Sequence, residues 1–344
     1  MRSLVVFLLS FLITYLTIPV LRKLAFTLNI LDLPGGRKIH KEATPLLGGI
    51  AVYFGLLLGV LTNWADLNFL FPIIIGGTIL VVVGIINDIQ ELGVLVRLFA
   101  QIVASIIVIS SGFRITFLPN NTIFGILPDQ LLTVVWIVGV TNAYNCLDGL
   151  DGLAAGSAVL NALCFGIILY ITGQYTLGLF AIIMIAACLA FLPYNFRNEK
   201  IFLGEAGSTF LGFTLACFAI VGEWAKADVV KLSIPILILG VPIFDMFFTT
   251  VMRIRDGKVK SVMEWMKYAG RDHFHHYLVD LGLRPHGAVV FIYFITFSLG
   301  LSAIMVCNDK PIEAYLSVIQ ASIIFSIIAV LIVIGRRRNS GWAS

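Results

Sequence analysis

The sequence predicts an all-α, polytopic integral membrane protein with about eleven transmembrane helices, organised as one domain over residues 1–344. Composition is the first reason, because 59% of the residues are hydrophobic and only 12% are charged, with a mean hydropathy of +1.01. A soluble domain has about 45–50% apolar and about 25% charged residues. The second reason is that apolar runs of bilayer-spanning length recur along the chain. The five cysteines are scattered singly, so neither a disulfide framework nor a cysteine-based zinc site is expected.

The apolar runs are the predicted spans, and short polar loops join most of them. No small-residue cleavage pattern follows the first run, which favours a retained span over a removed signal peptide. A polar stretch interrupts the runs between 128 and 171, so ten spans are an alternative to eleven. In chain order the predicted spans are 3–22, 46–62, 69–87, 93–111, 128–146, 152–171, 175–194, 202–221, 231–251, 286–306 and 312–335.

Lysine and arginine concentrate in alternate loops, and basic loops stay on the cytoplasmic side. This bias predicts an N-terminus outside and a C-terminus in the cytoplasm. It also puts the loops that are dense in polar residues on the cytoplasmic face, where the long loop at about 253–286 is predicted to form a small cap with a short amphipathic helix at 262–268. The two halves lack a repeat with matching broken spans, so the pattern favours an enzyme over a transporter, which stays an alternative.

The polar stretch at 142–156, Asn-Ala-Tyr-Asn-Cys-Leu-Asp-Gly-Leu-Asp-Gly-Leu-Ala-Ala-Gly, is the principal candidate for a functional site. A charged side chain near the bilayer core costs roughly 2.5–3.5 kcal/mol, so acids there usually face a watery cavity. Asn142 and Asn145 are three residues apart, as are Asp148 and Asp151, which on a helix keeps each pair on one face. The alternative interpretation is a polar loop whose glycines only make a turn.

Other predicted cytoplasmic segments also carry polar groups. Residues 36–41, Gly-Arg-Lys-Ile-His-Lys, suit phosphate groups, although the positive-inside rule alone also produces such clusters. Asp88 follows Asn87 at the end of a predicted span, and Glu205 lies at the mouth of another, where free helix N–H groups favour anions. Residues 271–276, Arg-Asp-His-Phe-His-His, hold three of the five histidines, but neither a cysteine nor a suitably spaced fourth ligand supports zinc.

Taken together, these groups predict phosphoryl transfer. Oxygen ligands on the acids suit Mg²⁺, with Mn²⁺ as an alternative, while the basic groups suit phosphate. In phosphoryl transfer, metal and cations position the reacting groups and offset developing charge. A site embedded in a membrane further predicts that one substrate is a lipid and that membrane lipids surround the protein. Nucleic acid is not an expected partner, and a homodimer is left open.

The segments 37–49, 142–156, 202–212, 242–245 and 271–278 occur in an order that resembles the polyprenyl-phosphate N-acetylhexosamine-1-phosphate transferases, a branch of glycosyltransferase family 4. The resemblance implies a fold of ten or eleven spans in the bacterial plasma membrane, with a cytoplasmic active site. There, undecaprenyl phosphate would attack the β-phosphorus of a UDP-N-acetylhexosamine, magnesium would bridge the pyrophosphate, and UMP would leave. The histidine loop is similar to that of enzymes that start O-antigen, teichoic acid or exopolysaccharide, which favours UDP-GlcNAc.

The resemblance also implies roles for individual residues. It links Asp88 to the lipid phosphate, the stretch around Asp148 to uridine binding and catalysis, and the histidine loop to the diphosphate and sugar. For Asp245 a structural role beside a cation is an equal alternative. The predicted set is: catalytic Asp88, Asp148, Asp151, His273 and His275; substrate-binding Arg37, Lys38, His40, Lys41, Asn142, Gly149, Leu150, Asp245, Arg271 and His276; metal-binding Asn145 and Glu205.

Two positions depart from the pattern of the family, which usually has Asp-Asp where this chain has Asn87-Asp88, and Asp where it has Glu205. Glu205 keeps the charge but adds a methylene, while magnesium demands near-octahedral geometry at roughly 2.0–2.1 Å. Asn87 can neither act as a base nor supply a negative ligand. If the first acid served as general base, its loss would cost about 10²–10⁴-fold in rate. A weak or inactive paralogue that binds lipid phosphate or nucleotide sugar is therefore an alternative, and the identity of any general base is open.

Overall fold

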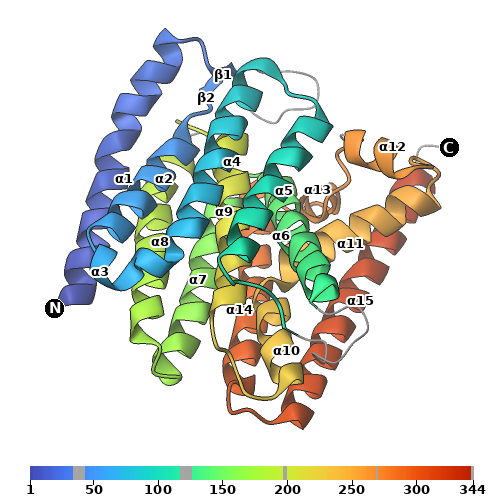
Figure 1. Ribbon diagram of the computed structural model, residues 1–344. Coiled ribbons are helices and arrows are strands. Elements are labelled where there is room, and N and C mark those ends of the chain that lie inside the picture. The colour runs from blue at the N-terminus through green and yellow to red at the C-terminus, as the bar shows by residue number, and fades with distance from the viewer. Residues whose placement is uncertain (34–42, 117–125, 197–199, 269, 342–344) are drawn as a thin grey trace. The chain divides into compact units, whose positions relative to one another are not determined.

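The computed structural model describes residues 1–33, 43–116, 126–196, 200–268 and 270–341 (Figure 1). The chain divides into two compact units, Met1–Glu223 and Trp224–Ser344, and each is described by itself. Within the described residues the structure is helical apart from two strands of two residues each. The predicted all-α fold class is therefore confirmed, whereas the prediction of one domain is not tested by this division.

Eight helices in the described part of the chain are long and apolar enough to cross a membrane, or nine if one bent pair is counted as a span. Two shorter apolar helices, Gly48–Leu61 and Val94–Ser110, coincide with further predicted spans. The protein is therefore a multi-pass membrane protein. The total of eleven spans and the sidedness of the two termini remain predictions.

The first unit contains one helix for each predicted span between 3 and 221, with ends displaced by a few residues. Each apolar run forms a helix because its backbone polar groups are then satisfied within the segment, as a bilayer requires. The elements are α1 (Arg2–Thr27), β1 (Leu31–Asp32), β2 (Thr44–Pro45), α2 (Gly48–Leu61), α3 (Trp64–Leu67), η1 (Asn68–Leu70), α4 (Phe71–Gln90), α5 (Val94–Ser110), α6 (Leu127–Leu147), α7 (Leu153–Ile171), α8 (Tyr175–Asn195) and α9 (Gly204–Val221).

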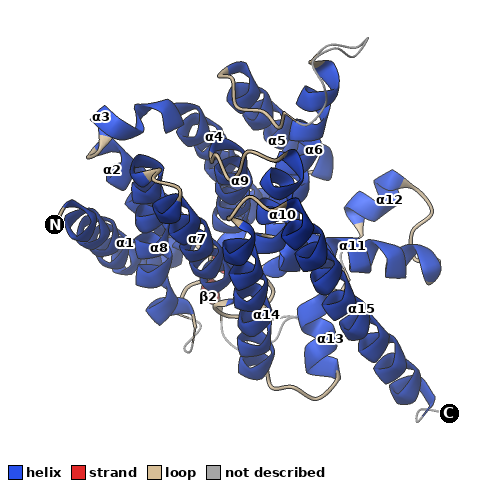
Figure 2. Ribbon diagram, turned by 90° about the horizontal axis from the view of Figure 1, so that it is seen from below, coloured by secondary structure: helices blue, strands red, loops and turns tan. Residues whose placement is uncertain are grey.

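Helix α9 is the core of the first unit, because 83% of its residues are buried. Helices α2, α4, α6 and α7 pack around it (Figure 2). Small residues allow this close packing. A Cβ atom added at Gly49 would meet the backbone of Gly207, and one added at Gly84 would meet the backbone of Ala206. Helices in membranes associate through such small residues, which let their backbones approach. The beginning of α9 is therefore held tightly between α2 and α4.

A short antiparallel pair of strands fixes the beginning of α9 from another side. Strands β1 and β2 pair with Leu31 opposite Pro45. The carbonyl oxygen of Pro45 accepts a hydrogen bond of 2.8 Å from the backbone N–H of Phe202, and the N–H groups of Gly48 and Gly49 donate to the carbonyls of Phe202 and Leu203 at 3.0 and 2.8 Å. The free N–H groups at the beginning of α2 thus bind the chain just before α9, which satisfies donors that a helix start leaves unpaired.

The second unit differs from the prediction in one element. The predicted span 231–251 is two helices, α10 (Asp228–Ile238) and α11 (Gly240–Arg255), bent by 77° at Leu239. Pro242 has no N–H to donate to the carbonyl of Ile238, so the helical ladder is interrupted there. The remaining helices are α12 (Val262–Lys267), α13 (Phe274–Asp280), α14 (Pro285–Val306) and α15 (Pro311–Gly341).

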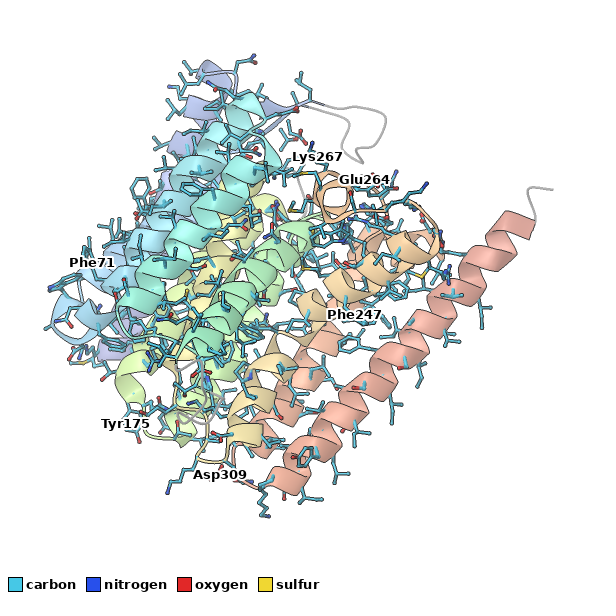
Figure 3. All side chains as sticks on the ribbon, turned by 45° about the vertical axis from the view of Figure 1, so that its right-hand side comes forward. Phe71, Tyr175, Phe247, Glu264, Lys267 and Asp309 are labelled. Atoms are coloured by element: carbon cyan, nitrogen blue, oxygen red, sulfur yellow. The ribbon has the colours of Figure 1, made fainter. Side chains whose placement is uncertain are left out.

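Helix α10 packs against α14 and α15, and α11 contacts α13, α14 and α15. Asp309, between α14 and α15, accepts hydrogen bonds from the N–H groups of Lys226 and Ala227 at 3.1 and 2.9 Å, just before α10. Figure 3 shows Asp309 at one end of this unit, with Glu264 and Lys267 of α12 at the other. Helix α12 confirms the short helix predicted at 262–268, and Ser261 caps it by accepting from the N–H of Glu264 at 3.2 Å.

Candidate functional site

The first carboxylate of the candidate site, Asp88, caps the beginning of α9 from the end of α4. Its two oxygens accept hydrogen bonds from the N–H groups of Glu205 and Ala206 at 3.0 and 3.4 Å. Gly204 has a φ of +73°, and a Cβ atom there would meet an oxygen of Asp88. Glycine is therefore required at this turn, and the negative charge of Asp88 lies where free helix N–H groups favour an anion.

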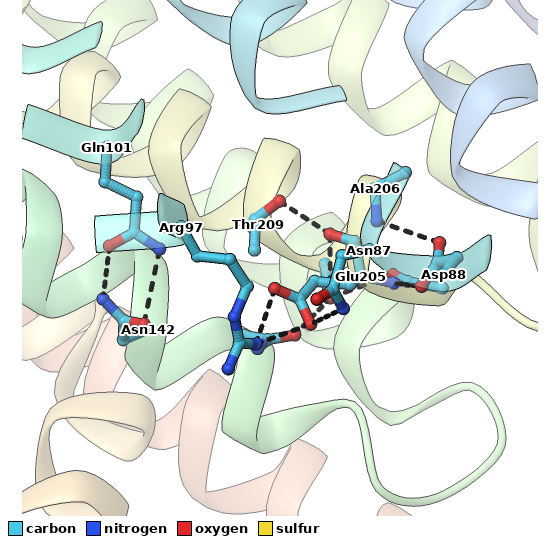
Figure 4. Close-up of polar contacts among 11 residues, drawn as sticks. Asn87, Asp88, Arg97, Gln101, Asn142, Glu205, Ala206 and Thr209 are labelled. Atoms are coloured by element: carbon cyan, nitrogen blue, oxygen red, sulfur yellow. Dashed lines mark hydrogen bonds and ion pairs between the residues drawn. The ribbon is translucent and has the colours of Figure 1, made fainter. Parts of the chain in front are cut away.

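The second carboxylate, Glu205, lies in the first turn of α9 and is bound by two side chains from other helices (Figure 4). Nη1 of Arg97, in the first turn of α5, lies 2.7 and 2.8 Å from its two oxygens. Nδ2 of Asn87 donates to Oε2 at 2.7 Å. The two positions that depart from the family pattern, Asn87 and Glu205, are therefore in direct contact.

The carboxamides of α6 are bound by different neighbouring helices. Asn142 and Gln101 of α5 exchange hydrogen bonds of 2.6 and 3.3 Å (Figure 4). Asn145 accepts a hydrogen bond of 2.8 Å from Oγ of Ser208 on α9. Asn145 thus lies beside the helix that carries Glu205, whereas the amide of Asn142 fixes α5 against α6.

Asp148 and Asp151 do not share a helix face. Helix α6 ends at Leu147, and both acids lie in the turn 148–152 before α7. Gly152 has a φ of +77°, which an L-residue rarely adopts and which ends the helical register. Asn195 holds this turn, because its Oδ1 accepts from the N–H of Gly152 at 2.6 Å and its Nδ2 donates to the carbonyl of Ile201 at 3.0 Å.

Asp148 is partly buried in this turn, with Gly149 exposed and Leu150 buried beside it. Loss of solvation by burial, together with the negative charges of Asp88 and Asp151, raises the pKa of Asp148 to about 7. Both forms of this carboxyl group are therefore populated near neutral pH. A pKa matched to the working pH is typical of functional carboxyl groups.

The oxygen donors of this cluster fit a hard divalent cation in chemistry. Carboxylate oxygens of Asp88 and Glu205 and the amide oxygen of Asn145 come from three helices, and Oδ1 of Asn87 is buried with no hydrogen-bond partner in the described part of the chain. Among the described residues, no group of three or more His, Cys, Asp or Glu side chains is arranged to hold a metal by itself. Magnesium is commonly bound by one or two carboxylates together with waters and substrate phosphates.

The histidine loop belongs to the second unit, where Asp245 of α11 organises it. Asp245 is fully buried and accepts a hydrogen bond of 2.6 Å from the N–H of Phe274. Its other oxygen lies 3.0 Å from Nδ1 of His273, whose Nε2 lies 3.3 Å from Nη2 of Arg253. Because arginine only donates, Nε2 of His273 accepts from Arg253 and Nδ1 donates to Asp245. These contacts are those expected of a structural partner, and a direct role of Asp245 stays a prediction.

His275 is 1% exposed, and neither of its ring nitrogens has a hydrogen-bond partner among the described residues. Burial lowers the pKa of His275 well below the usual value, and the charges of His276, His273 and Arg271 lower it further. Burial also lowers the pKa of His276, as does the charge of exposed Arg271. His275 is therefore neutral at physiological pH, so if it acts in catalysis, it acts as a base or a hydrogen-bonding group.

A buried ion pair holds the histidine loop to α11 and gives a testable stability effect. Arg253 donates to both oxygens of Asp272 at 3.1 and 2.7 Å, and the two residues are only 6% and 4% exposed. We expect Arg253→Met to lower the free energy of unfolding by about 3 kcal/mol, because it leaves a buried carboxylate with Lys258 alone, at 3.5 Å. The measurement is the thermal unfolding midpoint in detergent at a fixed heating rate.

Arg255→Met is the matched control for this prediction. Arg255 pairs with Asp256 at 3.1 Å, but its side chain is 51% exposed, and exposed pairs contribute only about 0–1 kcal/mol. Equal shifts in the two variants would show that the Arg253–Asp272 pair is not a buried structural contact.

The structure places the predicted residues in three groups. Asp88, Asp148, Asp151, Asn142, Asn145 and Glu205 gather at one end of the helices of the first unit, and Asp245, Arg271, His273, His275 and His276 belong to the second unit. Arg37, Lys38, His40 and Lys41 lie outside the described residues. Sequence reasoning missed Arg97, Gln101 and Asn195 as contacts of the site. The only signal for Arg97 was a single cation within an otherwise apolar span.

The protein belongs to the class of all-helical membrane proteins that carry acids, carboxamides and an arginine at the ends of their helices. This class includes membrane-bound transferases. The pattern of glycosyl transferase family 4 matches residues 70–223. A probable undecaprenyl-phosphate N-acetylglucosaminyl 1-phosphate transferase from Bacillus subtilis is 34% identical, covering 94% of this chain and 90% of the relative. A decaprenyl-phosphate N-acetylglucosaminephosphotransferase from Mycobacterium tuberculosis is 29% identical, over 94% and 87%. An undecaprenyl-phosphate alpha-N-acetylglucosaminyl 1-phosphate transferase from Escherichia coli K12 is 29% identical, over 82% and 78%.

The chain therefore belongs to glycosyl transferase family 4, as the resemblance of its motifs implied. The match to the Bacillus subtilis relative extends over nearly the whole of both chains, so both units of this chain are represented in it.

Proposed function

We propose that the protein transfers N-acetylhexosamine 1-phosphate, most favourably GlcNAc 1-phosphate, from a UDP-sugar to undecaprenyl phosphate and releases UMP. Transfer of a sugar phosphate to a polyprenyl phosphate is the activity that the names of all three relatives describe. The observation that carries the proposal is the meeting of Asp88, Glu205 and Arg97 from α4, α9 and α5. As the first membrane step of a cell-envelope polysaccharide, this reaction would use the cytoplasmic face of the bacterial plasma membrane.

In the proposed reaction, an oxygen of the lipid phosphate forms a bond to the β-phosphorus of the UDP-sugar. The bond between that phosphorus and the bridging oxygen breaks, and the bridging oxygen leaves with UMP. A phosphate dianion is already a nucleophile, so the chain's main task is to position the two phosphates and to offset charge. The turn at 148–152 would bind uridine, while the roles of His273, His275 and His276 at the diphosphate and sugar rest on the resemblance.

The proposal includes dependence on Mg²⁺, for which Mn²⁺ would substitute. Asn145 and Glu205 would hold the ion, which would supply positive charge to the diphosphate. The support is the oxygen chemistry of the cluster and the unpartnered Oδ1 of Asn87. Asp88, which the resemblance links to the lipid phosphate, would act on that substrate, and its carboxylate also fixes the beginning of α9 and thereby the position of Glu205.

The test is release of UMP by purified protein with undecaprenyl phosphate, MgCl₂ and a panel of UDP-sugars. We expect turnover with one UDP-N-acetylhexosamine, and we expect removal of divalent cations by EDTA to abolish it. Reactions without the lipid phosphate serve as controls for hydrolysis of the donor. A panel in which no UDP-sugar yields UMP above this control contradicts the proposal.

A second candidate function, binding without turnover, is favoured by the contact of Glu205 with Arg97 and Asn87. Those donors occupy the carboxylate that the transferase would use for its metal. This candidate predicts saturable binding of nucleotide sugar or lipid phosphate without UMP release. Appearance of activity in an Asn87→Asp variant, with the wild-type protein inactive, is the result that would favour it.

A further inference from the structure

The carboxylate of Glu205 already has a cationic partner within the chain. Arg97 contacts both of its oxygens, at 2.7 and 2.8 Å (Figure 4). The side chains of Arg97 and Glu205 are 27% and 15% exposed. Asn87 adds an uncharged donor at 2.7 Å. A carboxylate has about four acceptor positions, so these three contacts use most of its capacity.

A divalent cation and these donors cannot share the same oxygens. Magnesium binds oxygen at roughly 2.0–2.1 Å and tolerates little distortion of its octahedral shell. N–H groups directed at the same lone pairs would point their positive ends at the ion. Binding of a cation at Glu205 therefore requires that Arg97 withdraw and that the amide of Asn87 turn away or present its unpartnered Oδ1.

We propose that Arg97 is the resident cation of the Glu205 carboxylate and competes with the divalent ion, with Asn87 strengthening the competition. The inference rests on the proposed function insofar as that function assigns a metal to Glu205. Arg97 is a positioning residue, because it acts through Glu205. In consequence the protein binds divalent cations weakly without substrate, and the Arg97–Glu205 pair sets this affinity.

The test measures binding of Mn²⁺ alone, without lipid phosphate or nucleotide sugar, to the full chain in lipid nanodiscs. Electron paramagnetic resonance reports the free ion, and empty nanodiscs give the background. Because the lost contacts are charge-assisted hydrogen bonds, we expect Arg97→Gln to bind Mn²⁺ about 10- to 100-fold more tightly than the wild-type protein. The double variant Arg97→Gln/Glu205→Ala is expected to lose this gain.

Arg2→Gln is the matched control, since Arg2 is also paired with an acid, Asp66, but lies at the beginning of α1. It should bind Mn²⁺ as the wild-type protein does. Unchanged or weaker binding of Mn²⁺ by Arg97→Gln overturns the proposal, as does a gain that persists without Glu205.

If Arg97→Gln does not fold, Asn87→Asp replaces it. We expect Asn87→Asp to bind Mn²⁺ about tenfold more tightly than the wild-type protein, and no tightening there overturns the proposal. Failure of the transferase proposal would appear separately, as absence of UMP release.

Discussion

Replacing Asp88 with asparagine is expected to lower the rate of UMP release by about 10²- to 10⁴-fold, the range for loss of a group that acts in the transition state. The substitution keeps the size of the side chain, and its Oδ1 can still accept an N–H at the beginning of α9. Loss of a helix cap costs only about 0.5–2 kcal/mol. The measurement is the initial rate of UMP release beside the thermal unfolding midpoint, so that a charge effect is separated from a folding effect.

Asp66→Asn is the control for this prediction. It makes the same chemical change in an ion pair with Arg2, where the Asp66 side chain is 39% exposed. It should leave the rate within about twofold, since exposed ion pairs contribute little. Near-normal turnover in Asp88→Asn, with a lowered thermal midpoint, would show instead that Asp88 serves only as the cap of α9.

The span pattern could be predicted from the sequence because hydropathy is a local property. Ten of the eleven predicted spans coincide with one helix each, with ends shifted by a few residues. The exception, 231–251, has no polar interruption to mark the bend at Leu239. Pro242 was a local signal for it, but proline is tolerated in membrane helices, so its presence alone does not predict a break.

The acids of the site could be found because charge is rare in an apolar chain, but their contacts could not. Asp148 and Asp151 have a spacing that a helix and a turn share, and the positive φ of Gly152 decides between them. Arg97 and Glu205 are 108 residues apart in the sequence. The positive-inside rule already explains a cation at the beginning of a span, so the sequence gives no reason to expect an acidic partner for Arg97. The contact between Arg97 and Glu205 follows from the packing of α5 against α4 and of α4 against α9.

Asn87 and Glu205 looked like two independent departures from a family pattern, and the structure shows that they are one local arrangement. An aspartate at position 87 would place a second negative charge at the position from which Nδ2 now donates to Oε2 of Glu205 at 2.7 Å. Two carboxylates at that distance repel each other unless a cation or a proton lies between them. The carboxamide removes this repulsion, which allows Arg97 alone to balance the charge of Glu205.

Asp148 gives the second large expected effect, and its pKa fixes the direction of a pH dependence. Burial, with the charges of Asp88 and Asp151, raises the pKa to about 7, so the carboxyl group is mostly protonated below pH 7 and mostly ionised above it. Only the ionised form can accept a proton or bind through both oxygens. We therefore expect the rate of UMP release to rise by about tenfold between pH 6 and pH 8, with its midpoint near pH 7.

The stability contribution of the same group runs in the opposite direction. Because the pKa is raised on folding, the folded protein binds more protons than the unfolded chain between about pH 4 and pH 7, and this contribution to the free energy of unfolding falls as pH rises. The predicted rise in activity between pH 6 and pH 8 is therefore opposite in sign to the effect of Asp148 on folding. Asp148→Asn should reduce the rate by about 10²-fold or more and remove the step near pH 7 from whatever activity remains. A variant that keeps both the rate and the step would assign the pH dependence to another group and leave Asp148 as a structural residue of the turn.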